Sequence, residues 1–159
     1  MRTFHHLTHD LPGKPPFVPP ASPASEPHRR TRRDHATETA EDYVEAIAEL
    51  EASRGECRLV ELAKRFGVSH VTVNRTVSRL CKEGLAETAP YQPVSLTARG
   101  RRLANRCRKR HEVVLQFLVS IGVPAEVAAI DAEGMEHHVS PQTLRRFEAI
   151  ASEKDAGCN

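Results

Sequence analysis

One segment constrains the fold more than any other: LVELAKRFGVSHVTVNRTVSRLCKEGLAE, at residues 59–87. Apolar residues recur every three or four positions on both sides of Gly67, which predicts two short amphipathic helices. Glycine tolerates a positive φ angle, so Gly67 suits the turn between these helices. Ser69 is a favourable N-cap for the second helix, and Gly84 ends that helix.

Two short strand candidates follow, at residues 85–88 and 93–96, and residues 89–92 form the turn between them. The order of helix, glycine-containing turn, helix and two-stranded hairpin is that of a winged helix-turn-helix, which is a DNA-binding motif. We expect the two helices to pack through the following apolar side chains: Leu62, Ala63, Val68, Val73, Val77 and Leu80.

The opposite face of the second helix carries short polar groups near its start and long cations further on. Short side chains let the start of a helix approach the base edges of DNA, and arginine reaches phosphates or guanine. The tip of the hairpin would lie on the flanking backbone or in the minor groove. We therefore predict that double-stranded DNA is contacted by these residues: Ser69, His70, Thr72, Asn74, Arg75, Arg79 and Tyr91.

The composition narrows the class of protein further. The formal net charge is only +2, so a surface that binds nucleic acid must be local. No apolar run approaches the roughly 18 residues of a membrane span, and the first residues lack the apolar core of a secretory signal. The four cysteines form no CxxC pair, which fits free thiols in a reducing compartment. We expect a cytoplasmic protein that does not bind a membrane.

The start of the chain differs from the rest. Residues 1–36 hold seven of the eleven prolines and five of the nine histidines, without apolar periodicity. Such a stretch buries too little apolar surface to offset its ordering entropy, so we predict a disordered Pro/His-rich tail. The winged helix-turn-helix domain is expected at residues 37–97. A long helix from Thr97 to about Ser120 then opens a helical dimerisation and metal-binding domain at residues 98–155.

Two further helices are expected in that second domain, at residues 125–138 and at residues 140 to about 152. The expected fold class is therefore mainly α with a small β-wing: a winged helix-turn-helix followed by a helical dimerisation domain. The second domain is short for the apolar surface that it carries, which predicts a two-fold homodimer suited to a palindromic operator. The residues that require partners are Leu115, Phe117, Leu118, Ile121, Val127, Ile130, Leu144, Phe147 and Ile150.

The segment DAEGMEHHVS contains a second functional pattern. In a helix its acids and its first histidine, at positions i, i+3 and i+4, project from one face. An acidic pair with i, i+3 spacing lies in an upstream helix, whose apolar periodicity starts near Thr39 and which ends at Gly55. One histidine lies in the long helix where its sequence changes from basic to apolar. Their convergence would form a metal site made of Asp42, Glu45, His111, Glu133, Glu136 and His137.

Acidic side chains gathered in this way would repel one another and raise one another's pKa, and a divalent cation removes that penalty. Carboxylate and imidazole ligands without a thiolate suit Mn²⁺ or Fe²⁺. Glu136 lies between Glu133 and His137, so it is the best placed to bridge two ions in each subunit. His138 points about 100° away from His137, which favours a partly buried, hydrogen-bonded histidine that binds no metal.

Several segments together resemble the manganese transport regulator branch of the diphtheria-toxin-repressor superfamily. They are EDYVEAIAEL, RLVELAKRFGVSHVTVNRTVSRLCKEGL, VSLTARG, RHEVVLQFLVSIGV and DAEGMEHHVS, and they cover about residues 39–150 in the order of that family. The resemblance implies a dimeric, Mn²⁺-dependent repressor of manganese homeostasis genes, with metal sites between its two domains. By motif position it implies the same six ligands. Iron-responsive relatives place Cys at Glu133 and Met near Asp42, so the resemblance favours manganese.

Other functions remain to be weighed against a metal-dependent repressor. An iron-responsive regulator is one alternative. A metal-independent winged-helix regulator would use the acids and histidines only as structural groups. An enzyme with a dimetal centre is a third possibility, but the sequence contains no HExxH motif and a recognition helix has no role in catalysis. We therefore expect that the protein is not an enzyme.

Overall fold

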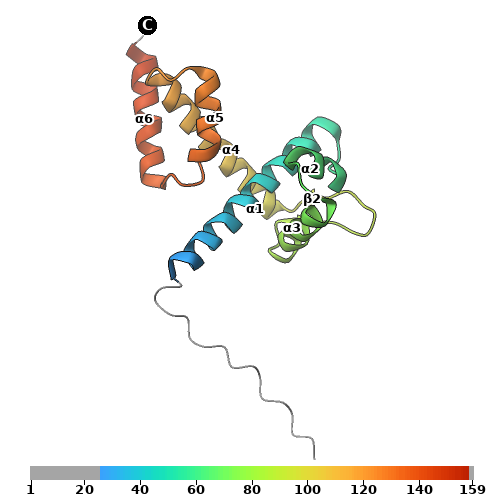
Figure 1. Cartoon of the computed structure of the whole chain (residues 1–159). Coiled ribbons are helices and arrows are strands. Elements are labelled where there is room, and N and C mark those ends of the chain that lie inside the picture. The colour runs from blue at the N-terminus through green and yellow to red at the C-terminus, as the bar shows by residue number, and fades with distance from the viewer. Residues whose placement is uncertain (1–25, 158–159) are drawn as a thin grey trace, which may run out of the picture.

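The fold is organised around two long helices. The computed structural model describes residues 26–157 of the chain. The helices α1 and α4 pack against each other; α2, α3 and a small sheet lie to one side, and α5 and α6 pack on the far end of α4 (Figure 1). This confirms a mainly helical fold with a small β-wing. The elements are α1 (Glu26–Arg54), α2 (Leu59–Phe66), α3 (His70–Lys82), β1 (Ala86–Glu87), β2 (Ser95–Leu96), α4 (Ala98–Ser120), α5 (Ala125–Met135) and α6 (Pro141–Gly157).

The helix-turn-helix consists of α2 and α3. Gly67 ends α2 in the left-handed conformation, with a φ angle of 63°. The Ser69 hydroxyl accepts a hydrogen bond from the backbone N–H of Thr72 at 3.2 Å, so it caps α3 as predicted. Five of the six apolar residues expected between the helices are buried, whereas Val68 is 36% exposed because it lies in the turn.

The hairpin is shorter than the sequence predicted. The strands β1 and β2 have two residues each and pair antiparallel, with Ala86 opposite Leu96. Val94 instead forms an isolated bridge with Cys57, where its N–H donates to the Cys57 carbonyl at 2.8 Å. The segment between α1 and α2 therefore adds a third, single-residue partner to the wing, which the sequence analysis did not predict.

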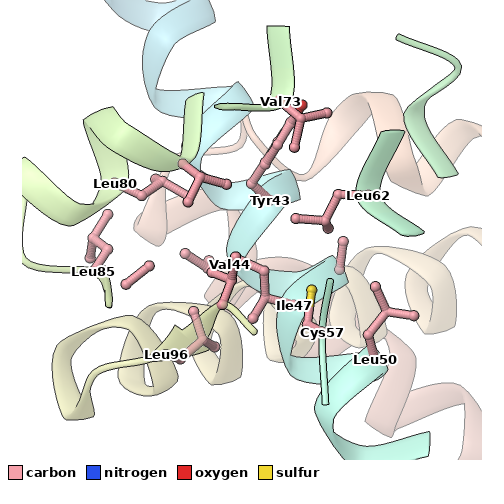
Figure 2. Close-up of a cluster of buried hydrophobic side chains, with 14 of the residues drawn as sticks. Tyr43, Val44, Ile47, Leu50, Cys57, Leu62, Val73, Leu80, Leu85 and Leu96 are labelled. Carbon is pink, nitrogen blue, oxygen red and sulfur yellow. The ribbon is translucent and has the colours of Figure 1, made fainter. Parts of the chain in front are cut away.

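The core of the DNA-binding domain is built on α1. Val44 and Ile47 are fully buried, in one cluster with Leu80 of α3 and Leu96 of β2 (Figure 2). The ring of Tyr43 stacks on the ring of Phe66 of α2, with 4.3 Å between the ring centroids. Because α1 supplies many residues of this core and packs on α2 and β2, it is an integral part of the helix-turn-helix domain rather than a linker.

The start of α1 differs from the prediction. Residues 26–36, which we expected to belong to a disordered tail, are helical. Residues 28–54 contain neither proline nor glycine, so no residue interrupts a helix that Pro27 can occupy in its first turn. The rest of the predicted tail, residues 1–25, lies outside the described residues.

A second core forms where α5 and α6 pack on α4. Leu118 and Ala132 are buried there, and the rings of Phe117 and Phe147 stack with their centroids 3.8 Å apart. Several residues that we expected to need a partner subunit are thus covered within the chain. Of the expected residues, Ile121, Val127 and Ile130 stay exposed, and so does Val119 of α4. In residues 26–157 no helix has the length and apolar character to cross a membrane.

Candidate metal centre and DNA-binding surface

A polar cavity of about 550 Å³ lies where α1, α4 and α5 meet. Its lining includes all six residues predicted to bind metal. The acidic pair comes from α1, one histidine comes from α4, and the others come from α5 and the turn that follows it. The six predicted ligands in this lining are Asp42, Glu45, His111, Glu133, Glu136 and His137.

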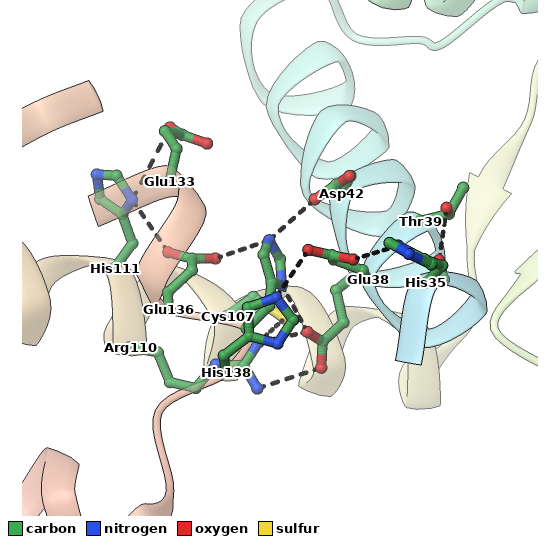
Figure 3. A network of polar contacts seen from close by, with 12 residues as sticks. His35, Glu38, Thr39, Asp42, Cys107, Arg110, His111, Glu133, Glu136 and His138 are labelled. Carbon is green, nitrogen blue, oxygen red and sulfur yellow. Dashed lines mark hydrogen bonds and ion pairs between the residues drawn. The ribbon is translucent and has the colours of Figure 1, made fainter. Parts of the chain in front are cut away.

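His111 faces the end of α5. Its Nδ1 atom lies 3.0 Å from Glu136 Oε2 and 3.8 Å from Glu133 Oε1 (Figure 3). The predicted helix was expected to continue to residue 138, but α5 ends at Met135. The N–H of Glu136 still donates to the Ala132 carbonyl at 3.0 Å, so the helical spacing that brings Glu133 and Glu136 together is kept.

His137 connects this group to α1. Its Nε2 atom lies 3.1 Å from Asp42 Oδ1 and 3.7 Å from Glu136 Oε1. The other ring nitrogen, Nδ1, lies 2.8 Å from Glu41 Oε2. The imidazole ring therefore has its Nε2 edge on two predicted ligands and its Nδ1 edge on a carboxylate that we did not predict to be functional.

Glu41 and Arg110 are the residues that sequence reasoning missed. Arg110 of α4 donates two hydrogen bonds to Glu41 of α1, at 3.2 and 2.6 Å, and Glu41 is 7% exposed. Burial and charge pairing of this kind leave no periodic pattern in a sequence. The available signal was slight: each of the two residues directly precedes a predicted ligand.

Burial has changed the acid–base properties of the cavity. It raises the pKa of both Glu45 and Glu136 to about 7, and neighbouring carboxylates add to the effect at both sites. Hydrogen bonds to Asp42 and Glu41 raise the pKa of His137 to about 10. The negative charge of these carboxylates is offset in part by His137 and Arg110, which lower the pKa of both glutamates.

These donors fit a divalent cation. Within the described residues, no three of them are arranged as a ready coordination shell, and they pair with one another. Glu136 Oε2 is buried and makes no hydrogen bond of suitable geometry, although His111 Nδ1 lies 3.0 Å away. A buried carboxylate oxygen without a hydrogen bond is an atom that a cation would satisfy.

His138 lies beside this cavity but does not line it. Its side chain is 62% exposed, so the expected partial burial is wrong, while the expected pairing is present: its Nε2 atom lies 3.3 Å from Glu38 Oε1. Glu38 also pairs with His35, at 3.2 Å. His138 is therefore held at the rim by α1.

The predicted DNA-reading face of α3 is exposed. Its apolar side is buried in the core, and the other side carries the predicted polar residues as one surface. Val71, on the same exposed side, is 65% accessible. The exposed residues of this face are Ser69, His70, Thr72, Asn74 and Arg75.

Arg79 is arranged differently from the rest of the predicted DNA contacts. Its Nη2 atom donates to the Ala36 carbonyl of α1 at 3.0 Å, and its Nε atom lies 3.8 Å from Glu83 Oε1. This half-buried arginine holds α3 against the start of α1. The helical residues 26–36, which were not expected, provide its acceptor.

Tyr91 projects from the tip of the wing. Its side chain is 99% exposed, and its backbone has a φ angle of 63°. The left-handed conformation is costly for a bulky residue, and such strain is found preferentially at functional sites.

Comparisons with known proteins agree with both halves of this structure. Residues 35–94 match the family described as "Iron dependent repressor, N-terminal DNA binding domain". Residues 97–154 match "Iron dependent repressor, metal binding and dimerisation domain". The "Transcriptional regulator MntR" of Escherichia coli O6:H1 is 45% identical over 128 residues, which cover 80% of this chain and 83% of that protein. The "HTH-type transcriptional regulator MntR" of Bacillus subtilis is 34% identical over 111 residues, covering 70% and 78%.

Two solved structures are also similar to this chain. A "Manganese-dependent transcriptional repressor complex with manganese" is 32% identical with a TM-score of 0.63, covering 70% of this chain and 52% of that one. The IdeR of T. acidophilum is 29% identical with a TM-score of 0.59, covering 67% and 51%. This chain thus spans about half the length of either solved protein.

The fold and the two matched domains define a winged-helix repressor with a metal-binding and dimerisation domain. The chain belongs to the MntR branch of the diphtheria-toxin-repressor superfamily, as the resemblance of its motifs predicted. This is a family of transcriptional repressors and not of enzymes.

Proposed function

We propose that the protein is a cytoplasmic, manganese-dependent transcriptional repressor that binds a palindromic operator as a homodimer and controls manganese homeostasis. One observation carries the proposal: six carboxylate and imidazole side chains from both domains line one cavity, and the recognition helix α3 of the same chain is exposed. The ligand set contains no thiolate, and the relatives named for manganese support Mn²⁺ over Fe²⁺.

The arrangement of the ligands explains how metal would control DNA binding. A bound divalent cation would supply the positive charge that the clustered carboxylates lack. Asp42 and Glu45 lie on α1, within the DNA-binding domain, whereas Glu133 and Glu136 belong to the other domain. Shared ligation by both pairs would fix α1, and α3 with it, relative to the dimerisation helices. The DNA-competent orientation would then be favoured by its higher affinity for metal.

We also propose two ions per subunit, with Glu136 between them. Its two oxygens face different histidines: Oε2 lies 3.0 Å from His111 Nδ1, and Oε1 lies 3.7 Å from His137. A carboxylate with one oxygen toward each histidine can contribute to two metal sites at once. Glu45 lines the same cavity from α1.

The experiment that tests this function measures operator binding with each candidate metal. A duplex selected from a random library in the presence of Mn²⁺ serves as operator, and fluorescence anisotropy follows binding under anaerobic conditions. We expect tight binding with Mn²⁺ and weak binding without metal. Equal affinity with and without metal would instead show a metal-independent regulator, and a response to Fe²⁺ alone would show an iron-responsive one.

Arg75→Ala is expected to weaken operator binding by about 1–3 kcal/mol and to relax preference at one base position, if the guanidinium reads a base. If Arg75 contacts phosphate, affinity should fall equally for all sequences and the salt slope should decrease by about one. Anisotropy at several salt concentrations separates the two contacts. A variant with unchanged affinity and salt dependence would remove Arg75 from the interface.

Metal binding is expected to release protons and to tighten as the pH rises from about 6 to 8. The metal-free pKa values of Glu45 and Glu136 are about 7 and that of His137 is about 10, and ligation requires the deprotonated forms. Folding raises all three pKa values, so protonation of these side chains contributes to the stability of the metal-free protein at low pH. The two glutamates lose it as the pH rises through about 7, and His137 loses it towards pH 10.

Calorimetric titration with Mn²⁺ in buffers of different ionisation enthalpy measures this release. An observed enthalpy that does not depend on the buffer would contradict the proton release and the assignment of these ligands.

The protein is expected to be a dimer at micromolar concentration, with or without metal. Ile121, Val127 and Ile130 remain exposed on the second domain, and a symmetric contact between two copies would cover them. Analytical ultracentrifugation measures the mass directly. A monomer under both conditions would contradict the proposal of a palindromic operator.

A further inference from the structure

The two oxygens of Glu41 are engaged by two different elements of the fold. Arg110 of α4 donates to Oε1 at 3.2 Å and to Oε2 at 2.6 Å. The Nδ1 atom of His137, which follows α5, lies 2.8 Å from Oε2. Glu41 itself belongs to α1. One buried carboxylate therefore joins the three parts of the chain that contribute metal ligands.

Glu41 is not placed to be a ligand. It is not among the residues that line the metal cavity, and the Arg110 guanidinium neutralises it in a paired, charge-assisted geometry. His137 lies between Glu41 and the cavity, with its Nε2 edge 3.1 Å from Asp42. Among the predicted ligands, Glu41 therefore makes its hydrogen-bond contact with the imidazole ring of His137.

We propose that Glu41, clamped by Arg110, is a positioning residue that accepts a hydrogen bond from Nδ1–H of His137 and so directs Nε2 to the metal. The inference rests on the proposed function, because it assumes that His137 is a ligand. An imidazole that carries its proton on Nδ1 has its lone pair on Nε2, which faces Asp42 and Glu136. A carboxylate on the distal nitrogen also makes a histidine ligand more basic and fixes the plane of its ring.

The clamp consists of protein side chains alone. His137 has a side-chain exposure of only 8%, and its ring is held from α1 through Glu41, which Arg110 holds in turn. Asp42, with 44% of its side chain exposed, lies 3.1 Å from the opposite edge of the ring. The buried imidazole is therefore held more closely by the protein than the exposed carboxylate.

The test uses Glu41→Gln in the full-length protein. The amide keeps the size of the side chain, but it can hydrogen-bond to either tautomer of His137, so the preference for the tautomer with its proton on Nδ1 is lost. Loss of an outer partner of a metal ligand typically weakens metal binding by about 10–100-fold, and we expect a loss of this size for Mn²⁺ by calorimetry. Glu112→Gln is the matched control, since it removes an exposed acid of α4 that does not line the cavity.

A spectroscopic readout separates positioning from general stability. In the protein loaded with diamagnetic Zn²⁺, ¹⁵N-edited NMR should show a slowly exchanging Nδ1–H on His137, shifted downfield by its carboxylate acceptor. In Glu41→Gln this signal should move upfield or exchange with water. A side chain that only supports the fold would change the melting temperature without changing this proton or the Mn²⁺ affinity of the folded protein.

A second variant guards against misfolding, because Glu41→Gln leaves Arg110 without its anion. The double substitution Glu41→Ala with Arg110→Met removes both buried charges, and we expect the same loss of Mn²⁺ affinity from a folded protein. If folded Glu41→Gln or the double variant keeps an affinity within about twofold of the original chain, with Nδ1–H unchanged, the inference is overturned. If the original chain itself binds no Mn²⁺, the proposed function fails instead.

Discussion

Glu136→Ala is expected to abolish metal-dependent operator binding and to leave a folded dimer with weak, non-specific DNA affinity. Glu136 is 2% exposed and faces both His111 and His137, so its removal takes a carboxylate from the centre of the ligand group. We expect Mn²⁺ affinity to fall by more than the roughly 10–100-fold that loss of an outer partner costs. Calorimetry measures Mn²⁺ binding, and anisotropy at saturating Mn²⁺ measures operator binding.

The stability of this variant separates loss of a ligand from loss of the fold. The raised pKa of Glu136, about 7, means that ionising it within the metal-free protein is unfavourable. Alanine removes that cost above pH 7 but leaves a cavity, so we expect a folded protein. Glu148→Ala, an exposed acid of α6, is the control and should behave as the original chain. Wild-type metal stoichiometry and operator affinity in Glu136→Ala would show that the proposed site is wrong.

Gly100→Ala is expected to destabilise the protein by at least about 3 kcal/mol, at the upper end of what overpacking costs. Gly100 lies in the first turn of α4, where a methyl group would overlap the carbonyl oxygen of Leu85 and would lie 3.1 Å from Leu96 Cδ2. The nearest atom belongs to the backbone, so relief would require α4 to move away from the wing.

The matched control is Gly134→Ala, because nothing lies within 4 Å of the added methyl group. That substitution within α5 should stabilise the protein by about 0.5–1 kcal/mol. Urea denaturation of both variants gives the two free energies of unfolding. Equal stabilities for the two variants would contradict the close packing of α4 on the wing.

The parts of the structure that the sequence predicted are those fixed by local chemistry. Gly67 and Ser69 placed the turn and the start of α3 correctly, since left-handed backbone and N-capping need particular residues. The i, i+3, i+4 spacing of Glu133, Glu136 and His137 correctly placed these residues at one cavity, because helical geometry brings such positions to one side. The resemblance added which distant helices would supply the remaining predicted ligands, a matter that spacing alone leaves open.

The parts that the sequence did not predict depend on tertiary contacts. Glu41 and Arg110 form a largely buried ion pair, although glutamate and arginine are usually exposed to solvent. Arg79 was expected on DNA, and its hydrogen bond to Ala36 depends on a helix that was expected to be disordered. A Pro-rich composition marks residues 1–36 as one segment, but only the absence of proline after Pro27 fixes where the helix can begin.

The central claim is that metal and operator stabilise the same arrangement of α1 on the dimerisation helices. Linkage then requires the operator to tighten Mn²⁺ binding by the factor by which Mn²⁺ tightens operator binding. The most direct measurement is calorimetric titration of Mn²⁺ into the free protein and into the protein bound to its selected duplex. We predict an affinity about 5–150-fold higher for the DNA-bound protein, the range of typical allosteric coupling. Identical Mn²⁺ isotherms with and without DNA would contradict the account.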